Sequence, residues 1–80
     1  MPKLRVLSAE NIIKIFLLHQ FTVESQRGSH VKLVRNVEGE RQTLIVPFHK
    51  EIDKGTLKAI FKQATRYIDE SELRKDFFTP

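Results

Sequence analysis

The spacing of the apolar residues changes twice along this chain of 80 residues. Between residues 9 and 19 they recur at intervals of three and four, which is typical of an amphipathic helix, and Ser8 is a candidate N-cap. Between residues 21 and 47 they alternate with polar residues or form β-branched runs, which predicts strands. From Leu57 onward the helical spacing returns. Because each period suits only one kind of element, the chain must fold as a helix, then strands, then a helix.

The links between the strands are short, which limits how the strands can be arranged. One turn is expected around residues 27–29 and a second around Gly39. Short links favour an antiparallel meander, because a parallel crossover needs a dozen residues or more. Pro47 has no backbone N–H to donate, so we expect it to close the third strand.

The second half of the chain predicts two more helices. Thr56 is a candidate N-cap for the helix that begins near Leu57, and Ser71 for a short final helix that returns Leu73 and Phe77 to the core. We therefore predict one α+β domain over residues 1–80, with the order α-β-β-β-α and a short extra C-terminal helix. The three-stranded antiparallel meander would carry both long helices on one face and leave the other open, as in the double-stranded-RNA-binding domain (dsRBD) fold.

Composition excludes several classes of protein. The chain has no cysteine, which removes disulfides, thiol nucleophiles and thiolate metal sites. The longest apolar run, at 12–18, is shorter than the roughly 20 residues that span a bilayer, and no signal-peptide pattern is visible. We therefore expect a cytoplasmic protein. The net charge of +4 favours an anionic partner such as nucleic acid, although the same charge also serves solubility.

The three histidines are isolated from one another in the sequence, and none has the spacing of a metal-binding motif. We therefore expect no metal and no cofactor. His19 would lie near the terminal carbonyls of the first helix, and His49 would tie down the loop at 50–55. A structural role is also the more common one for a lone strand histidine such as His30.

His30 nevertheless has neighbours that suit chemistry on a phosphodiester. Gly28 permits a positive φ or a close approach of the backbone to a ligand, and Ser29 offers a hydroxyl and an amide. Arg27 and Lys32 supply positive charge. A histidine can take a proton from a ribose 2′-hydroxyl or give one to a leaving 5′-oxygen, and RNA carries its own nucleophile.

A second group of cations belongs to the second long helix. Lys58, Lys62 and Arg66 are spaced by four residues, which would place them in one row opposite the apolar stripe. They are candidates for binding RNA phosphates with an affinity that falls steeply with salt. The alternative is an ordinary solvated basic face.

With these residues identified, the chain resembles the HicA family, the small mRNA-interferase toxins of bacterial toxin–antitoxin pairs. The resemblance covers roughly residues 8–68 and is strongest in QRGSHVKL at 26–33 and LIVPFHKEIDKGTLKAIFKQA at 44–64. It implies a metal-independent endoribonuclease acting on mRNA, with His30 as the nucleolytic histidine and Gly28 and Ser29 in the preceding turn. It also implies a HicB-type antitoxin that covers the histidine region.

The chain departs from the family pattern in two places. Gln20 stands where the family commonly has glycine after the first helix, so a left-handed cap there would cost more. Beyond about residue 65 the sequence is only loosely similar to the family. Two rival functions stay open: a non-catalytic RNA-binding domain of dsRBD-like fold, and a protein-interaction module with an acidic partner. We expect the free chain to be a monomer.

Overall fold

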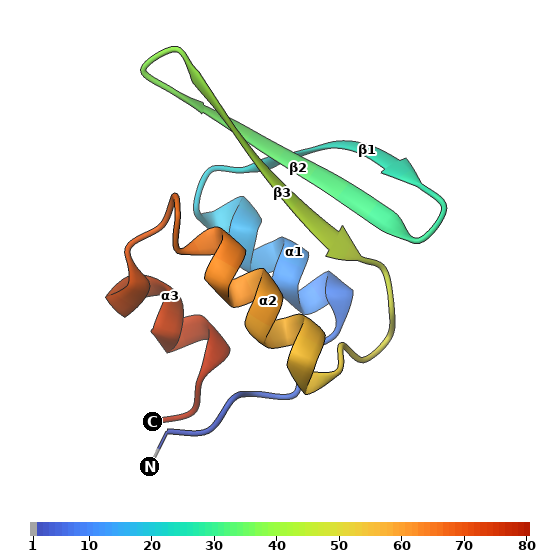
Figure 1. Cartoon of the computed structure of the whole chain (residues 1–80), viewed down its shortest axis with the longest axis vertical. Coiled ribbons are helices and arrows are strands. Elements are labelled where there is room, and N and C mark those ends of the chain that lie inside the picture. The colour runs from blue at the N-terminus through green and yellow to red at the C-terminus, as the bar shows by residue number, and fades with distance from the viewer. Residues whose placement is uncertain (1) are drawn as a thin grey trace.

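The computed structural model describes residues 2–80 and confirms the predicted α+β, dsRBD-like order, including the extra C-terminal helix. Figure 1 shows α1 and α2 on one side of the sheet, and α3 beside α2 and away from the strands. Among the residues described, no helix is long and apolar enough to cross a membrane. The elements are α1 (Ala9–Leu18), β1 (Thr22–Arg27), β2 (His30–Val37), β3 (Glu40–Pro47), α2 (Lys54–Ala64) and α3 (Glu70–Phe77).

The sheet is an antiparallel meander in the order β1-β2-β3, as predicted. Glu38 and Gly39 form the turn between β2 and β3 with φ of 51° and 79°, the two positive values that a type I′ hairpin requires. The tip of this hairpin extends beyond the helices (Figure 1). Pro47 is the last residue of β3, where its missing donor breaks no further pairing.

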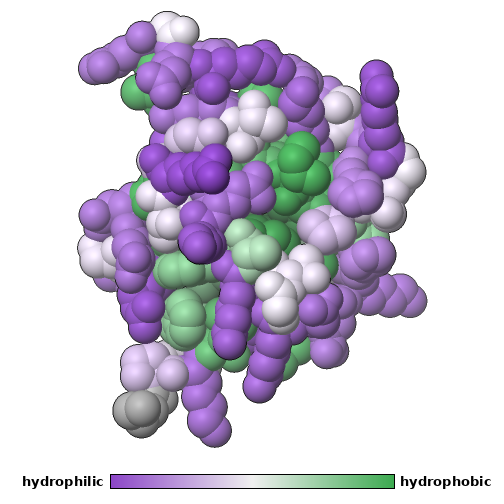
Figure 2. Space-filling view, viewed as in Figure 1, coloured by the Kyte–Doolittle hydropathy of each residue, from purple (hydrophilic) through white to green (hydrophobic). Residues whose placement is uncertain are grey.

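Side chains along β2 alternate between the two faces of the sheet. Val31 and Leu33 are buried against the helices, whereas His30 is exposed and Lys32 half-buried on the opposite face. Hydrophilic residues cover much of the side of the molecule seen in Figure 2, with hydrophobic residues gathered toward its middle. The core combines residues of all three helices and all of the strands except β1; its largest fully buried side chains are Phe16, Phe21, Phe77, Ile12, Leu33, Leu44, Leu57, Leu73 and Val46.

The helix N-termini agree with the sequence in one case and differ in two. Ser8 caps α1 as predicted, accepting from the Asn11 N–H at 3.0 Å while the Asn11 side chain accepts from the Ser8 N–H at 3.1 Å. The predictions of Thr56 and Ser71 as N-caps were wrong, because Asp53 and Asp69 occupy those positions. A carboxylate at a helix N-terminus also interacts favourably with the helix dipole.

Asp53 shows why the aspartate displaces the threonine as the cap of α2. Its carboxylate accepts from the Thr56 N–H at 3.1 Å and from the Thr56 hydroxyl at 2.7 Å, so Thr56 acts as donor and not as cap. The hydrogen bond from the Thr56 hydroxyl holds the pKa of Asp53 below its ordinary value of 3.8, with the Thr56 amide contributing. The side chain is therefore ionised at neutral pH, as the helix N-terminus favours.

The first helix ends in a left-handed residue that is not glycine. Gln20 has a φ of 74°, so the chain turns from α1 into β1 in the conformation for which the family commonly uses glycine. The Gln20 side-chain amide donates to the Leu18 carbonyl at 3.4 Å, a local bond near the helix end. The turn after α1 thus keeps the left-handed conformation expected for it, although glutamine adopts this conformation less readily than glycine.

The N- and C-terminal segments lie side by side (Figure 1). Leu4 forms an antiparallel bridge with Phe78, the Arg5 N–H donates to the Phe77 carbonyl at 2.8 Å, and the Thr79 N–H donates to the Lys3 carbonyl at 2.7 Å. These bonds hold α3 against the body of the protein, where Leu73 and Phe77 are fully buried as predicted.

Arg35 of β2 connects the central strand to the end of α1 and to the chain between α2 and α3. Its guanidinium donates to the His19 carbonyl at 2.9 Å, the Tyr67 carbonyl at 2.7 Å and the Gln42 side chain at 2.8 Å. It also lies over the Phe21 ring, 4.7 Å from the centroid. A planar fork with five donors can satisfy several acceptors at once, which a lysine cannot do in this geometry.

The turn between β1 and β2 depends on Gly28. This residue has a φ of +56°, yet a Cβ placed on it would meet no atom within 4 Å. Glycine is thus favoured here by the backbone conformation and not by lack of space.

We predict that Arg35→Met lowers the free energy of unfolding by about 2–3 kcal/mol, because half-buried acceptors lose a charged donor. Urea denaturation at neutral pH measures the difference. The matched control is Arg66→Met, which removes the same charge from an exposed position and should change stability by less than about 0.5 kcal/mol. Equal losses in the two variants would contradict the assigned role of Arg35.

We also predict opposite effects for two glycine substitutions. Gly28→Ala should destabilise the protein by about 1–2 kcal/mol, because alanine is strained at positive φ. Gly55→Ala lies inside α2, where the new Cβ would meet the Asp53 carboxylate at an ordinary 3.4 Å, and should stabilise the protein by about 0.5–1 kcal/mol. Thermal unfolding of both variants checks the difference in sign.

Candidate functional site

The open face of the sheet contains a hollow of about 520 Å³ to which every strand contributes. Three residues predicted from the sequence, Arg27, His30 and Lys32, meet in it. The complete lining is Glu24, Ser25, Arg27, His30, Lys32 and Ile45. Positive charge and an imidazole therefore share one solvent-accessible concavity, on the face that the helices leave uncovered.

The strand register places His30 in this hollow. His30 is the first residue of β2 and pairs with Arg27 on β1 and with Pro47 on β3. Paired residues of antiparallel strands point to the same face, so the Arg27 and His30 side chains are neighbours. The hydrogen bonds and ion pairs found within residues 2–80 do not involve the His30 ring, and the residue is exposed. Its ring nitrogens are thus accessible to a ligand.

A β-bulge in β1 is what brings Arg27 onto the same face as His30. Before the bulge Thr22 pairs with Val34, and after it Ser25 pairs with Lys32 and Arg27 with His30, so the register shifts by one residue between Val23 and Ser25. In a regular strand Thr22 and Arg27 would point to opposite faces. The extra residue reverses the alternation and turns Arg27 toward the open face.

The bulge also introduces a carboxylate that is absent from the site residues predicted from the sequence. Glu24 lines the hollow, lies 3.5 Å from the Lys32 Nζ and accepts a hydrogen bond from the Arg41 guanidinium. That hydrogen bond, together with the charges of Arg41 and Lys32, lowers the pKa of Glu24 from its ordinary value. The alternation of apolar and polar residues in β1 shows that Glu24 is a polar position. Neither the bulge nor the contact with Arg41 on β3 can be recognised from the residues around Glu24.

The turn before His30 holds the predicted Gly28 and Ser29, and both are exposed. The Ser29 carbonyl accepts from the Phe48 N–H, which joins this turn to the chain that leaves β3. The backbone around the turn is therefore fixed at the rim of the hollow while its outer side is open to solvent.

The cations of the second helix are exposed but lie apart from His30. The helix α2 ends at Ala64, so Arg66 falls just beyond it and the predicted row of three is not continuous along one helix. Lys62 and Arg66 do line one hollow of about 570 Å³, together with Ala59, Gln63 and Thr65. Lys58 is not among the residues that line it.

The two hollows approach each other at the free edge of β3. The Gln63 side-chain oxygen accepts from the Ile45 N–H at 3.1 Å. Ile45 lines the hollow that contains His30, and Gln63 lines the hollow that contains Lys62 and Arg66. One hydrogen bond thus joins a residue of the His30 hollow to a residue of the hollow that contains Lys62 and Arg66.

The other two histidines differ from each other in their surroundings. The His19 Nε2 lies 3.4 Å from the Asp76 carboxylate and so links the end of α1 to α3, and the terminal helix carbonyls are not its partner. The predicted tie between the His49 side chain and the loop at 50–55 is not found, because His49 is exposed and its ring has no hydrogen bond or ion pair within residues 2–80. Its carbonyl accepts from the Ala9 N–H at 3.0 Å, so only its backbone links the chain after β3 to the start of α1. In the part of the chain described, no group of three His, Asp or Glu residues is arranged to hold a metal ion.

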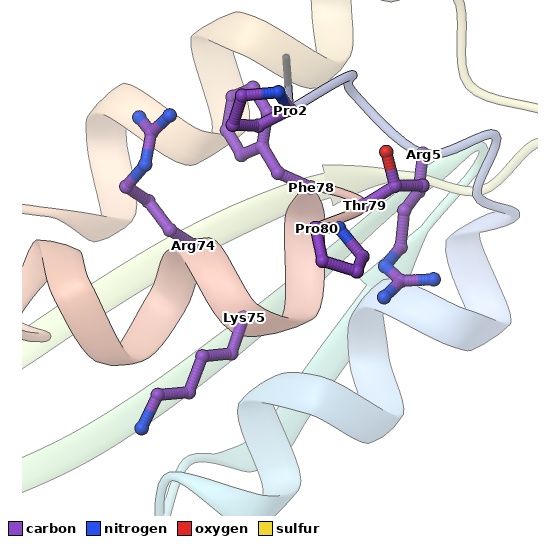
Figure 3. A pocket seen from close by; sticks show the side chains of 7 residues that line it. All are labelled: Pro2, Arg5, Arg74, Lys75, Phe78, Thr79 and Pro80. Atoms are coloured by element: carbon purple, nitrogen blue, oxygen red, sulfur yellow. The ribbon is translucent and has the colours of Figure 1, made fainter.

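A third hollow, of about 410 Å³, lies where the termini meet (Figure 3). Most of the surface that lines this hollow is apolar. The Arg74 guanidinium lies 4.4 Å from the centre of the Phe78 ring. Arg74 and Lys75 are paired with Glu70 and Glu72 on the same helix. In Figure 3 the charged ends of Arg5, Arg74 and Lys75 point in different directions, so they do not converge on one anion.

Comparison with known proteins identifies the family. Residues 9–65 match the family model described as the HicA toxin of bacterial toxin–antitoxin systems. The matched segment includes every residue of the His30 hollow as well as Lys58 and Lys62, whereas Arg66 and α3 lie outside it. Comparisons with curated proteins and with solved structures found no match. Since the family model covers more than half of the chain, this protein belongs to the HicA family of toxins and is one half of a toxin–antitoxin pair.

Proposed function

We propose that this toxin is a metal-independent endoribonuclease that cleaves mRNA, with His30 as its proton-transfer residue. The observation that carries the proposal is the position of His30: exposed on the open face, in one hollow with Arg27 and Lys32, and with no intramolecular bond to its ring within residues 2–80. His19 differs because its ring is paired with Asp76. His49 is also exposed and its ring is unbonded in the same range, so what distinguishes His30 is the pair of cations in its hollow.

The reaction needs few protein groups because RNA supplies the nucleophile. In the proposed mechanism the neutral imidazole of His30 accepts the proton of the ribose 2′-hydroxyl as that oxygen attacks the adjacent phosphorus. The resulting imidazolium gives a proton to the 5′-oxygen as the P–O bond breaks. The products are a 2′,3′-cyclic phosphate on one fragment and a 5′-hydroxyl on the other, and the histidine returns to its neutral state.

The neighbouring residues would stabilise the charge that develops during this reaction. Arg27 and Lys32 would balance the negative charge of the pentacoordinate phosphorus, which is largest in the transition state. Gly28 and Ser29, at the exposed rim, would let the RNA backbone approach the turn closely. Proximity and charge together can account for a rate enhancement without a metal ion.

The cations of α2 would hold the rest of the strand. RNA leaving the His30 hollow across Ile45 reaches the hollow of Lys62 and Arg66 at the edge of β3. Lys58, one turn earlier on α2, would extend the same contact. Phosphate contacts of this kind provide affinity with little sequence preference.

The partner in the cell would be a HicB-type antitoxin that covers the His30 hollow. Blocking a concavity open to solvent is sufficient to exclude RNA, so inhibition would not require a change of fold in the toxin. We propose that the free toxin is a cytoplasmic monomer whose activity depends on the supply of antitoxin.

We predict that His30→Ala reduces cleavage of single-stranded RNA by about 100-fold or more, because a general acid–base residue typically contributes 10²–10⁴ to the rate. The variant should keep the far-ultraviolet circular dichroism spectrum and thermal stability of the parent, and should no longer arrest growth in a bacterium. His49→Ala, an exposed histidine in a different hollow, is the matched control and should cleave normally. Undiminished cleavage by His30→Ala would reject the assignment, and binding without any cleavage by the parent would favour a non-catalytic RNA-binding domain.

We also predict that the double variant Lys62→Ala, Arg66→Ala binds single-stranded RNA more weakly and with a shallower dependence on salt. The slope of log K against log salt should fall by about 0.7 for each phosphate that the protein no longer neutralises. Lys14→Ala combined with Lys75→Ala removes the same charge from positions on α1 and α3 and should leave the slope close to that of the parent. Fluorescence anisotropy over a salt series gives both slopes, and identical slopes would remove α2 from the RNA path.

A further inference from the structure

The hollow around His30 contains one carboxylate among its cations. Glu24 lies at the bulge of β1, and its two oxygens contact two different cations, the Lys32 Nζ at 3.5 Å and the Arg41 guanidinium. Lys32 belongs to β2 and Arg41 to β3, so these contacts cross the whole open face from one edge of the sheet to the other. Arg41 is not among the RNA-binding residues predicted from the sequence.

The three side chains remain accessible to solvent. Their exposed fractions are 34% for Glu24, 41% for Lys32 and 50% for Arg41. Ion pairs at such exposure contribute little to stability, since water competes for each charge. Breaking these ion pairs therefore costs little free energy, and a ligand with the same charge as the Glu24 carboxylate can displace it from the two cations.

A phosphodiester is a ligand of that kind. Like a carboxylate, it carries one negative charge on two equivalent oxygens, and arginine binds both groups with the same bidentate geometry. Along β2, Lys32 lies two residues from His30, and Arg41 pairs with Asn36 farther along the same strand. The cations thus follow the open face away from His30, in the direction that a strand bound at His30 could continue.

We propose that Arg41, together with Lys32 at the scissile phosphate, binds the phosphate next to the cleaved bond, and that Glu24 occupies these two cations as an internal counter-ion until RNA displaces it. The proposal rests on the proposed ribonuclease function and adds to it a phosphate contact, Arg41, and a carboxylate that competes with the substrate. It predicts that the toxin binds RNA less tightly than its cations alone would allow.

The test uses the full chain with His30→Ala, so that RNA stays intact and the protein can be expressed. Glu24→Gln in this background should lower the Kd for a fluorescein-labelled single-stranded RNA by about two- to tenfold, as expected for the loss of two exposed competing ion pairs. The slope of log K against log salt should steepen by about 0.7 for each phosphate that the freed cations bind. Glu24→Asp keeps the charge and should bind like the background protein.

Two further variants separate local competition from a change in net charge. Glu40→Gln removes the same charge from an exposed position at the far end of the β2–β3 hairpin and should leave the Kd within about twofold of the background. Arg41→Ala should weaken binding more in the Glu24→Gln protein than in the protein with Glu24, because only there is the guanidinium free of its counter-ion.

The outcomes distinguish this proposal from the proposed function. RNA binding that is equally tight in the background protein, the Glu24→Gln variant and the Glu40→Gln variant, or that is insensitive to Arg41→Ala, overturns the counter-ion proposal and leaves the nuclease intact. Absence of RNA binding by every variant at low salt overturns both. A thermal melt of each variant shows whether the contacts across the sheet are also needed for folding, and tighter binding by Glu24→Gln despite an unchanged melting temperature supports the proposal.

Discussion

The alternation of side chains along β2 is the constraint on which both the stability and the candidate site depend. This strand pairs on both sides, so its register is held by β1 and β3 together. Val31 and Leu33 face the helices and are buried, while His30 and Lys32 face the open side. A shift by one residue would move the imidazole and the cation into the core and the aliphatic side chains into solvent. The packing that stabilises the fold therefore also keeps the site in place.

The site itself is made by a departure from regular structure. The bulge in β1 shifts the register by one residue, which turns Arg27 toward His30 and places Glu24 against Lys32 and Arg41. Bulges of this kind often redirect side chains near functional sites, and here the redirection adds both a cation and its counter-ion. The balance of charge in the hollow is thus set by one inserted residue and not by the overall excess of lysine and arginine.

The segment beyond the family match completes the core. In α3, Phe77 packs against Phe16 of α1 and Phe61 of α2, with ring centroids 6.2 Å and 5.4 Å apart. Arg35 joins the same regions through polar contacts, since it bonds to the end of α1 and to the chain between α2 and α3. Aromatic packing therefore holds the three helices to one another, and Arg35 joins this helical layer to the sheet, while the open face is left free for a ligand.

The sequence was enough to predict the order of the helices and strands. The spacing of apolar residues and the positions of turn residues both depend on interactions between residues close together along the chain. The sequence also identified the glycine turn and the grouping of Arg27, His30 and Lys32, which lie within six residues of one another. The aspartate caps were missed because aspartate, serine and threonine can all begin a helix. Hydrogen bonds from the Thr56 N–H and hydroxyl identify Asp53, whereas the side chain of Asp69 makes no capping hydrogen bond and only the backbone places it at the N-cap. No residue type in β1 marks the bulge, and the contacts of Glu24 with Arg41 and of Arg35 with the His19 and Tyr67 carbonyls join segments 16 to 32 residues apart. Pairing between distant segments depends on the whole packed structure, and no local pattern of residues encodes it.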